Sequence, residues 1–265
     1  MTIAEATVAA PDGTAEPQRR VAVVTGAAAG IGNSIAERLA RDGFAVALIG
    51  RTPGTAAAAA ADIVAAGGTA AGYDADVADR EQVDAAVEAI RADLGPVSVV
   101  VANAAVAPQQ SFLDMTLDEW NTTIGTNLTG TFNTVQSCLP DLVEAGWGRV
   151  ILISSSSAQR GAPRMAHYAA SKGGQLALAK ALAVEFARQG ITVNTVVPSS
   201  IDTPSVEKKR AAGKIPSAED MAKFIPVGRM GTGADIAGAV SYLASDDTSY
   251  VTGQTISVNG GSFIG

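Results

Sequence analysis

Residues 21–32 read VAVVTGAAAGIG, a short apolar run followed by a turn with three glycines. The run from Val21 to Thr25 is typical of a buried parallel strand, and the apolar residues after Gly32 recur at helical spacing as far as Gly43. A strand, a glycine-rich turn and a helix in that order lay a pyrophosphate on the helix N-terminus, because glycines let the backbone approach the phosphates. The segment therefore predicts dinucleotide binding, although its G-x-x-x-G-x-G spacing differs from the commoner G-x-G-x-x-G.

The same alternation of strand and helix patterns continues along the chain. Strand-like runs are expected at residues 21–25, 44–49, 70–73, 97–101, 149–153, 191–197 and 254–258, with helical patterns between them. Such alternation implies a parallel, doubly wound sheet. We therefore expect an α/β fold, a single Rossmann-like domain over residues 19–265 with a seven-stranded parallel sheet flanked by helices. Residues 1–18 are expected to form a flexible N-terminal extension.

The composition limits the possible partners. The chain has 265 residues, 47% of them hydrophobic, and a formal net charge of −7, which argues against nucleic acid or an anionic membrane as the main partner. No apolar run reaches the roughly 18 residues that span a membrane, and residues 1–18 lack the features of a signal peptide. The single cysteine, Cys138, cannot form an internal disulfide, which suits a reducing compartment and predicts a cytoplasmic location.

Tyr168 and Lys172 form a titratable pair in a helical pattern that runs to Phe186. They are four residues apart, so a helix places them one turn apart on one face. A phenol has a pKa of about 10, too high for proton transfer at neutral pH, and a nearby ammonium is expected to lower it. The pair by itself is also common on solvated helix faces. Its function therefore depends on what else the chain brings to it.

The end of the predicted second strand indicates which dinucleotide is favoured. An acidic residue there binds the 2′-hydroxyl of the adenosine ribose, whereas an arginine accepts a 2′-phosphate. This chain has Gly50, Arg51 and Thr52 at that point and no acid. We therefore expect NADP(H) to be favoured over NAD(H), the alternative being that Arg51 is a solvated charge without a ligand.

Polar residues also follow later elements. Ser154–Ser157 comes after the fifth predicted strand, at the edge where parallel sheets bind ligands, although serine clusters are also ordinary loops. Asn127 lies at the junction of two helical patterns, at 116–126 and 128–145. Residues from about 199 to 225 are irregular with short charged helical pieces, which is typical of a substrate lid. No metal site is expected.

Together these features resemble the short-chain dehydrogenase/reductase family over nearly the whole chain from Arg19 to Gly265. The resemblance implies a catalytic set of Asn127, Ser155, Tyr168 and Lys172. Ser155 lies thirteen residues before Tyr168, the family's usual gap, which selects it from the four serines. The cofactor-binding residues that the resemblance implies are Thr25, Gly26, Ala29, Gly30, Ile31, Gly32, Arg51, Thr52, Asp76, Val77, Asn103, Ala104, Tyr168, Lys172, Pro198, Ile201 and Thr203.

Two positions depart from the family pattern. Ala105 replaces the last residue of an Asn-Ala-Gly turn, and Ser199 follows Pro198 where the family usually has glycine beside the nicotinamide. Neither change removes a group from the implied catalytic set. The Ser199 side chain is expected to narrow or reshape the site beside the nicotinamide.

The mechanism that the resemblance implies is hydride transfer between nicotinamide and a ketone or secondary alcohol. Tyr168 exchanges a proton with the substrate oxygen, and Ser155 holds that oxygen by a hydrogen bond. Lys172 lowers the Tyr168 pKa and binds the nicotinamide ribose, while Asn127 holds a water in a relay from Lys172 to solvent. His167, the only histidine, is expected to be structural or to line the pocket, not to act as the base.

The C-terminal stretches most resemble those of bacterial 3-oxoacyl reductases, and they are Pro226–Gly231, Val251–Gln254 and Asn259–Gly261. The leading function is therefore reduction of a 3-oxoacyl-type or small carbonyl substrate. The alternatives are an NAD-dependent dehydrogenase of cyclic or steroid-like alcohols and a non-catalytic cofactor-sensing protein. Relatives that use acyl carrier protein have basic docking residues at positions that fall near Gly146 and Gln189, and neither is basic here. A small-molecule substrate is therefore expected. The family is usually tetrameric, and the helices at 128–145 and 176–186 are expected to supply the homotetramer interface.

Overall fold

The computed structural model describes residues 19–264. Within them, seven parallel strands form one sheet in the order β3-β2-β1-β4-β5-β6-β7. The predicted Rossmann-like α/β fold is confirmed, whereas the extension predicted over residues 1–18 lies outside the described residues. The strands are β1 (Val21–Thr25), β2 (Ala45–Gly50), β3 (Thr69–Asp74), β4 (Val97–Ala102), β5 (Gly148–Ile153), β6 (Ile191–Pro198) and β7 (Thr255–Val258).

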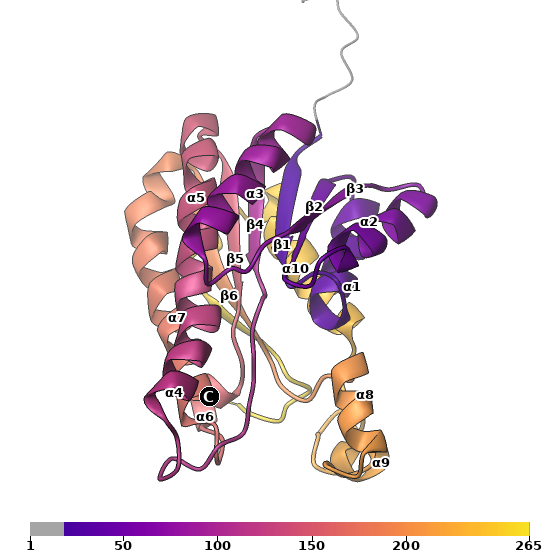
Figure 1. The fold of residues 1–265 in the computed structure, drawn as a ribbon. Coiled ribbons are helices and arrows are strands. Elements are labelled where there is room, and N and C mark those ends of the chain that lie inside the picture. The colour runs from indigo at the N-terminus through magenta and orange to yellow at the C-terminus, as the bar shows by residue number, and fades with distance from the viewer. Residues whose placement is uncertain (1–18, 265) are drawn as a thin grey trace, which may run out of the picture.

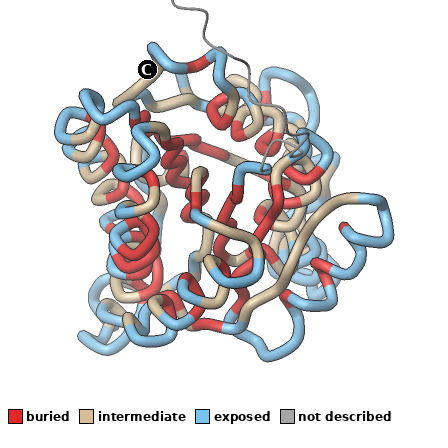
Figure 2. Tube along the Cα trace, turned by 90° about the horizontal axis from the view of Figure 1, so that it is seen from above, coloured by how far each residue is buried: buried red, intermediate tan, exposed pale blue. Residues whose placement is uncertain are grey.

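The central strands contribute side chains to two hydrophobic layers, because successive side chains of a strand point to opposite faces of the sheet. In β1, Ala22 and Val24 belong to one core cluster, whereas Val21 and Val23 belong to the other. All of β1 is buried, which explains why its sequence is a continuous apolar run. Figure 2 shows buried strands at the centre, enclosed by helices with exposed outer turns.

Helices cover both faces of the sheet (Figure 1). One layer holds α1 (Gly30–Arg41), α2 (Thr55–Ala65) and α10 (Gly233–Ala244), whose apolar residues pack in the cluster of Ala22. The other layer holds α3 (Arg80–Asp93), α5 (Gly130–Ala145) and α7 (Ala166–Phe186), which pack in the cluster of Val21. The hydrophobic core therefore lies on both sides of the sheet.

The helix junction predicted around Asn127 is a π-helical turn. α4 (Leu117–Ile124) continues through the π turn Gly125–Thr129 into α5. A capping box between Thr116 and Glu119 fixes the start of α4. π turns are rare and occur frequently at functional sites, and this one carries Asn127.

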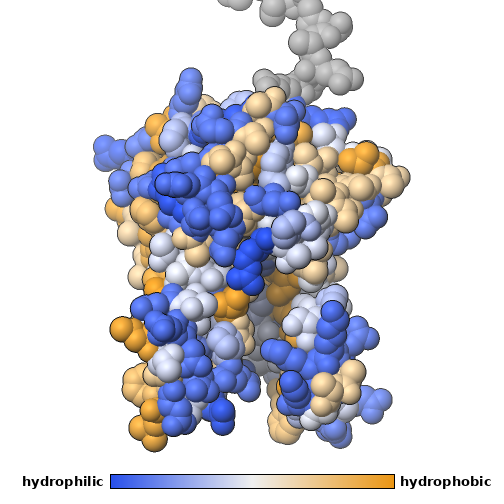
Figure 3. All heavy atoms as spheres, in the orientation of Figure 1, coloured by the Kyte–Doolittle hydropathy of each residue, from blue (hydrophilic) through white to orange (hydrophobic). Residues whose placement is uncertain are grey.

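The carboxyl ends of the strands lead to a hollow in the molecule. The strand order reverses between β1 and β4, where open α/β sheets bind ligands. Beyond that edge lie α6 (Ser157–Arg160) on one side, and α8 (Pro204–Ala211) and α9 (Ala218–Ala222) of the predicted lid on the other. The space-filling view shows the surface hollowed between these two parts (Figure 3).

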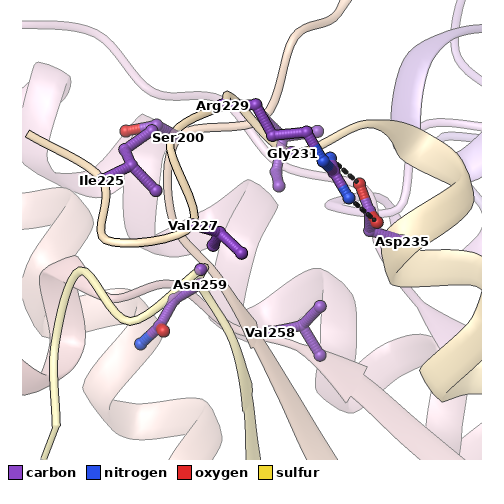
Figure 4. A pocket seen from close by; sticks show the side chains of 10 residues that line it. Ser200, Ile225, Val227, Arg229, Gly231, Asp235, Val258 and Asn259 are labelled. Carbon is purple, nitrogen blue, oxygen red and sulfur yellow. Dashed lines mark hydrogen bonds and ion pairs between the residues drawn. The ribbon is translucent and has the colours of Figure 1, made fainter. Parts of the chain in front are cut away.

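The segment that follows the predicted lid is anchored on α10. Arg229 pairs with Asp235 at 2.8 Å, and these hydrogen bonds hold the pKa of the Asp235 carboxyl well below its usual range. A cavity of about 80 Å³ lies beside the pair, lined by Ile225, Val227 and other residues (Figure 4). In the part of the chain that the structure describes, no helix is long and apolar enough to cross a membrane.

Candidate active site

A hydrogen-bonded joint connects the carboxyl ends of β1 and β4. Thr25 Oγ1 accepts from the N–H groups of Asn103 and Ala104, each at 3.0 Å. The Asn103 side-chain amide donates to the carbonyls of Thr25, at 2.9 Å, and Gly26, at 3.2 Å. These predicted cofactor residues therefore also hold the two loops together at the point where the strand order reverses.

The glycine turn leaves no room for side chains where it approaches this joint. A Cβ on Gly32 would lie 2.3 Å from the Gly26 carbonyl oxygen, and one on Gly26 would lie 2.9 Å from Ala104 Cα. α1 begins after Ala29, which makes no side-chain cap, so the first N–H groups of the helix are left uncapped by that residue. Such groups bind phosphate oxygens. The turn therefore fits the pyrophosphate of a dinucleotide.

A cavity of about 190 Å³ opens beside the turn. Arg51 lines it, with its side chain 63% exposed and its guanidinium 3.9 Å from the Asp76 carboxylate. An ion pair so long and exposed is weak, which leaves Arg51 donors available for an anionic ligand. The cavity brings together six predicted cofactor residues: Gly26, Arg51, Thr52, Asp76, Val77 and Ala104.

Sequence reasoning missed the other lining residues of this cavity. Val106 is the most informative of them, because its N–H donates to Asn127 Oδ1 at 2.8 Å and its carbonyl accepts from Asn127 Nδ2 at 3.0 Å. Its position directly after the Asn-Ala-Ala turn is the signal that could have identified it. The missed residues are Ile49, Ala75, Val106 and Thr126, and they line the cavity together with Ala105, which the sequence marked only as a departure from the family pattern.

The serines after β5 have different partners. Ser155 Oγ accepts from the Ser157 N–H at 3.2 Å, and its hydroxyl is near enough to Tyr168 to lower the pKa of the phenol. Ser156 Oγ donates to the Ser199 hydroxyl at 3.2 Å. The serine that the spacing selects, Ser155, is therefore the one near the phenol. The Ser199 side chain, which departs from the family pattern, is held by Ser156.

Tyr168 and Lys172 approach each other on α7, with the ammonium nitrogen 5.9 Å from the phenol ring centroid. Lys172 Nζ donates to the Ile153 carbonyl at 2.6 Å and to Gln175 Oε1 at 3.1 Å. Burial lowers the pKa of Lys172 to about 7. The expectation that Lys172 lowers the pKa of Tyr168 is not met in this structure. Burial raises the pKa of the phenol, and the Ser155 hydroxyl opposes this rise. Lys172 does not contribute, because its ammonium is directed toward β5 and Gln175.

Asn127 is buried in the π turn, and both ends of its side chain are engaged. In addition to its bonds with Val106, Nδ2 donates to Ser171 Oγ at 3.0 Å. The Asn127 backbone carbonyl accepts from Thr131 Oγ1 at 2.8 Å and from Gln175 Nε2 at 3.0 Å. These bonds tie the π turn to α7 within one turn of Lys172.

The remaining predicted residues lie around the same edge of the sheet. Pro198 ends β6, Ile201 is buried, and the Thr203 side chain lies 3.7 Å from the position of a Cβ on Gly30. His167 is fully buried, and neither of its ring nitrogens has a hydrogen-bond partner among the described residues. Residues 19–264 contain no group of three or more side chains that could hold a metal ion.

Known proteins match this chain along most of its length. A family model described as enoyl-(acyl carrier protein) reductase matches residues 26–262. Acetoacetyl-CoA reductase of Shinella zoogloeoides is 41% identical over 246 residues, 92% of this chain and 98% of that protein. The 3-oxoacyl-(acyl-carrier-protein) reductase of Staphylococcus aureus strain Mu50 is 38% identical over 244 residues, again 92% and 98%. A variant of the actinorhodin polyketide ketoreductase solved with NADPH has a TM-score of 0.88 and 32% identity, covering 92% of this chain and 97% of that one.

Proposed function

Because this chain belongs to the short-chain dehydrogenase/reductase family and is an NAD(P)-dependent oxidoreductase, we propose that it reduces 3-oxoacyl-type ketones with NADPH. The observation that carries the proposal is the cluster of three side chains at one edge of the sheet. Tyr168 and Lys172 lie one turn apart on α7, with the ammonium 5.9 Å from the phenol ring centroid, and Ser155 follows β5 near enough to lower the pKa of the phenol. The glycine turn lies at the same edge. When bound, the reduced nicotinamide supplies the hydride.

The chain's own residues supply the proton and the geometry. Tyr168 donates its phenolic proton to the ketone oxygen as the carbonyl carbon is reduced, so that the product is the secondary alcohol. Ser155 stabilises the negative charge that develops on that oxygen and on the phenolate. Lys172 binds the cofactor ribose, and Asn127 fixes the π turn behind it.

The cofactor preference rests on Arg51. Its exposed guanidinium and its long distance to Asp76 leave donors for the 2′-phosphate, while the glycine turn from Thr25 to Gly32 holds the pyrophosphate. Arg51→Ala should lower the specificity constant for NADPH by about 10- to 100-fold and leave that for NADH nearly unchanged. Arg41→Ala is the matched control, an exposed arginine at the far end of α1. Equal decreases in the specificity constants for NADPH and NADH would show that Arg51 does not bind the 2′-phosphate.

The substrate class follows from the surface charge. Glu144, Gly146 and Gln189 are exposed at the positions where carrier-dependent relatives are expected to be basic, and the chain carries a net charge of −7. An acidic carrier protein is repelled by such a surface. We therefore assign coenzyme A thioesters and small ketones, not carrier-bound acyl chains, as substrates.

The test compares specificity constants for acetoacetyl-coenzyme A, acetoacetyl-carrier protein and cyclic ketones at low and moderate salt. We expect the coenzyme A thioester to exceed the carrier-bound substrate about tenfold or more at low salt. Glu144→Lys combined with Gln189→Arg should raise activity toward the carrier-bound substrate alone. A wild-type preference for the carrier, weakening as salt rises, would overturn the assignment, and turnover with the cyclic ketones alone would favour an alcohol dehydrogenase of cyclic substrates.

We further propose that the protein is one catalytic domain over residues 19–265, with a substrate lid at about 199–225, and that it works as a cytoplasmic homotetramer. Exposed Phe132 on α5 and Val184 on α7 support the expected interface helices. The lone cysteine, which is buried and free, supports a reducing compartment.

A further inference from the structure

Gln175 links Lys172 to the π turn. Its side chain is fully buried on α7, one turn after Lys172. Gln175 Oε1 accepts from Lys172 Nζ at 3.1 Å. Gln175 Nε2 donates to the Asn127 carbonyl at 3.0 Å and to Thr131 Oγ1 at 2.6 Å. All polar atoms of this amide are therefore used in one continuous bridge.

The partners of the Gln175 amide fix its orientation. An ammonium is only a donor, so it must face the amide oxygen, and a backbone carbonyl is only an acceptor, so it must face the amide NH₂. Reversing the amide would set two donors against each other at Lys172 and two acceptors against each other at Asn127. The bridge therefore has one satisfied arrangement, and a buried network that is fully satisfied is rigid.

We propose that Gln175 is a positioning residue for the active site, whose amide holds the Lys172 ammonium against the π turn, in the place where the family resemblance puts a relay water. The inference rests on the proposed function for its catalytic meaning. Thr131 reinforces the bridge, because its hydroxyl accepts from Gln175 and donates to the same Asn127 carbonyl. The amide neither gains nor loses protons in the working pH range, so Gln175 holds the ammonium but does not pass protons toward the π turn.

The bridge also bears on the charge of Lys172. Burial disfavours the charged ammonium, and this desolvation lowers the pKa of Lys172. An acceptor at 3.1 Å favours the charged form. Tyr168 is the titratable side chain beside it, at 5.9 Å from the ring centroid. Removing the Gln175 oxygen should therefore shift the Lys172 titration to lower pH.

The direct test follows Lys172 in the cofactor-free protein by NMR, with lysine labelled at Cε, through a pH titration. Gln175→Met keeps the length of the side chain and removes its polar atoms, and we expect the Lys172 midpoint to fall by about one pH unit. Gln175→Glu places a negative charge beside the ammonium, and we expect the midpoint to rise. Lys172→Met assigns the signal. Both variants lose the contact with the Asn127 carbonyl. A general loss of packing would therefore shift the Lys172 midpoint in the same direction in both, whereas the bridge predicts shifts of opposite sign.

Kinetics supply the second measurement and the control. Gln175→Met should lower kcat about tenfold with little change in the KM for the substrate, and the pH above which kcat falls should move down with the NMR midpoint. The control is Thr134→Val on α5. Thr134 is buried and its hydroxyl donates to the Gly130 carbonyl of the same helix, so the change should alter stability but neither the Lys172 midpoint nor the pH above which kcat falls. Unchanged Lys172 midpoints in both Gln175 variants would overturn the inference even if the enzyme is active. An inactive wild-type enzyme with the expected midpoints would instead contradict the proposed function.

Discussion

Tyr168 is the proton donor of the proposed reaction, and removing its hydroxyl group tests this role. Tyr168→Phe keeps the ring and its packing but removes the transferable proton, so kcat should fall by about 100-fold or more while cofactor affinity stays nearly the same. Turnover is followed by cofactor absorbance, and binding by fluorescence titration. Tyr242→Phe, at an exposed tyrosine on α10, should be neutral. A Tyr168 variant that retains more than roughly a few per cent of the rate would assign the proton to another group.

Lys172 should make stability depend on pH. Its pKa falls from 10.5 to about 7 on folding, so between these values the unfolded chain binds more protons and the free energy of unfolding rises with pH. Compared with Lys172→Met, the wild type should therefore gain stability from about pH 7 upward, by at most about 1.4 kcal/mol per pH unit, with no further change below pH 7. Urea unfolding at about pH 6, pH 7.5 and pH 9 measures the difference. A constant difference would mean that Lys172 titrates normally in the folded protein.

At the scale of elements, two glycines of α10 should respond oppositely to the same substitution. A Cβ on Gly233 would lie 2.1 Å from Ser34 Oγ on α1, whereas a Cβ on Gly238 meets nothing within 4 Å. Gly233→Ala should cost about 1–3 kcal/mol, because the two helices must separate. Gly238→Ala should gain up to about 1 kcal/mol, because alanine loses less entropy in a helix. Denaturant unfolding compares them, and shifts of the same sign would contradict the close α1–α10 packing.

At the scale of the whole molecule, the proposed assembly predicts different outcomes for charges on the two helical layers. Val184 on α7 is 85% exposed and Val64 on α2 is 52% exposed. Val184→Glu should break the tetramer, because it buries an unpaired charge at the proposed interface. Val64 lies on α2 in the opposite helical layer, so Val64→Glu should leave the tetramer intact. Light scattering after size-exclusion chromatography gives the masses, and a monomeric wild type or a tetrameric Val184 variant would remove α7 from the interface.

Much of this architecture was predictable because it depends on local patterns. The run from Val21 to Thr25 is apolar on both faces of its strand, and this pattern predicts a buried parallel strand. The thirteen-residue gap selected Ser155 from four serines as a prediction, and in the structure this serine lies near enough to Tyr168 to lower the pKa of the phenol. The exact helix ends at Asn127 were harder to predict, because a π turn keeps helical geometry and has no distinct residue signature.

The sequence by itself determined the order of strands and helices, the glycine turn and the spacing of Ser155, Tyr168 and Lys172. Periodicity and backbone freedom are properties of neighbouring residues, so a linear chain displays them. The tertiary structure alone decided where the Lys172 ammonium points and how the Tyr168 pKa shifts. Both depend on burial and on the neighbours that each side chain meets, which are Ile153 and Gln175 for Lys172 and Ser155 for Tyr168. These groups come together only after the sheet and its helices have packed.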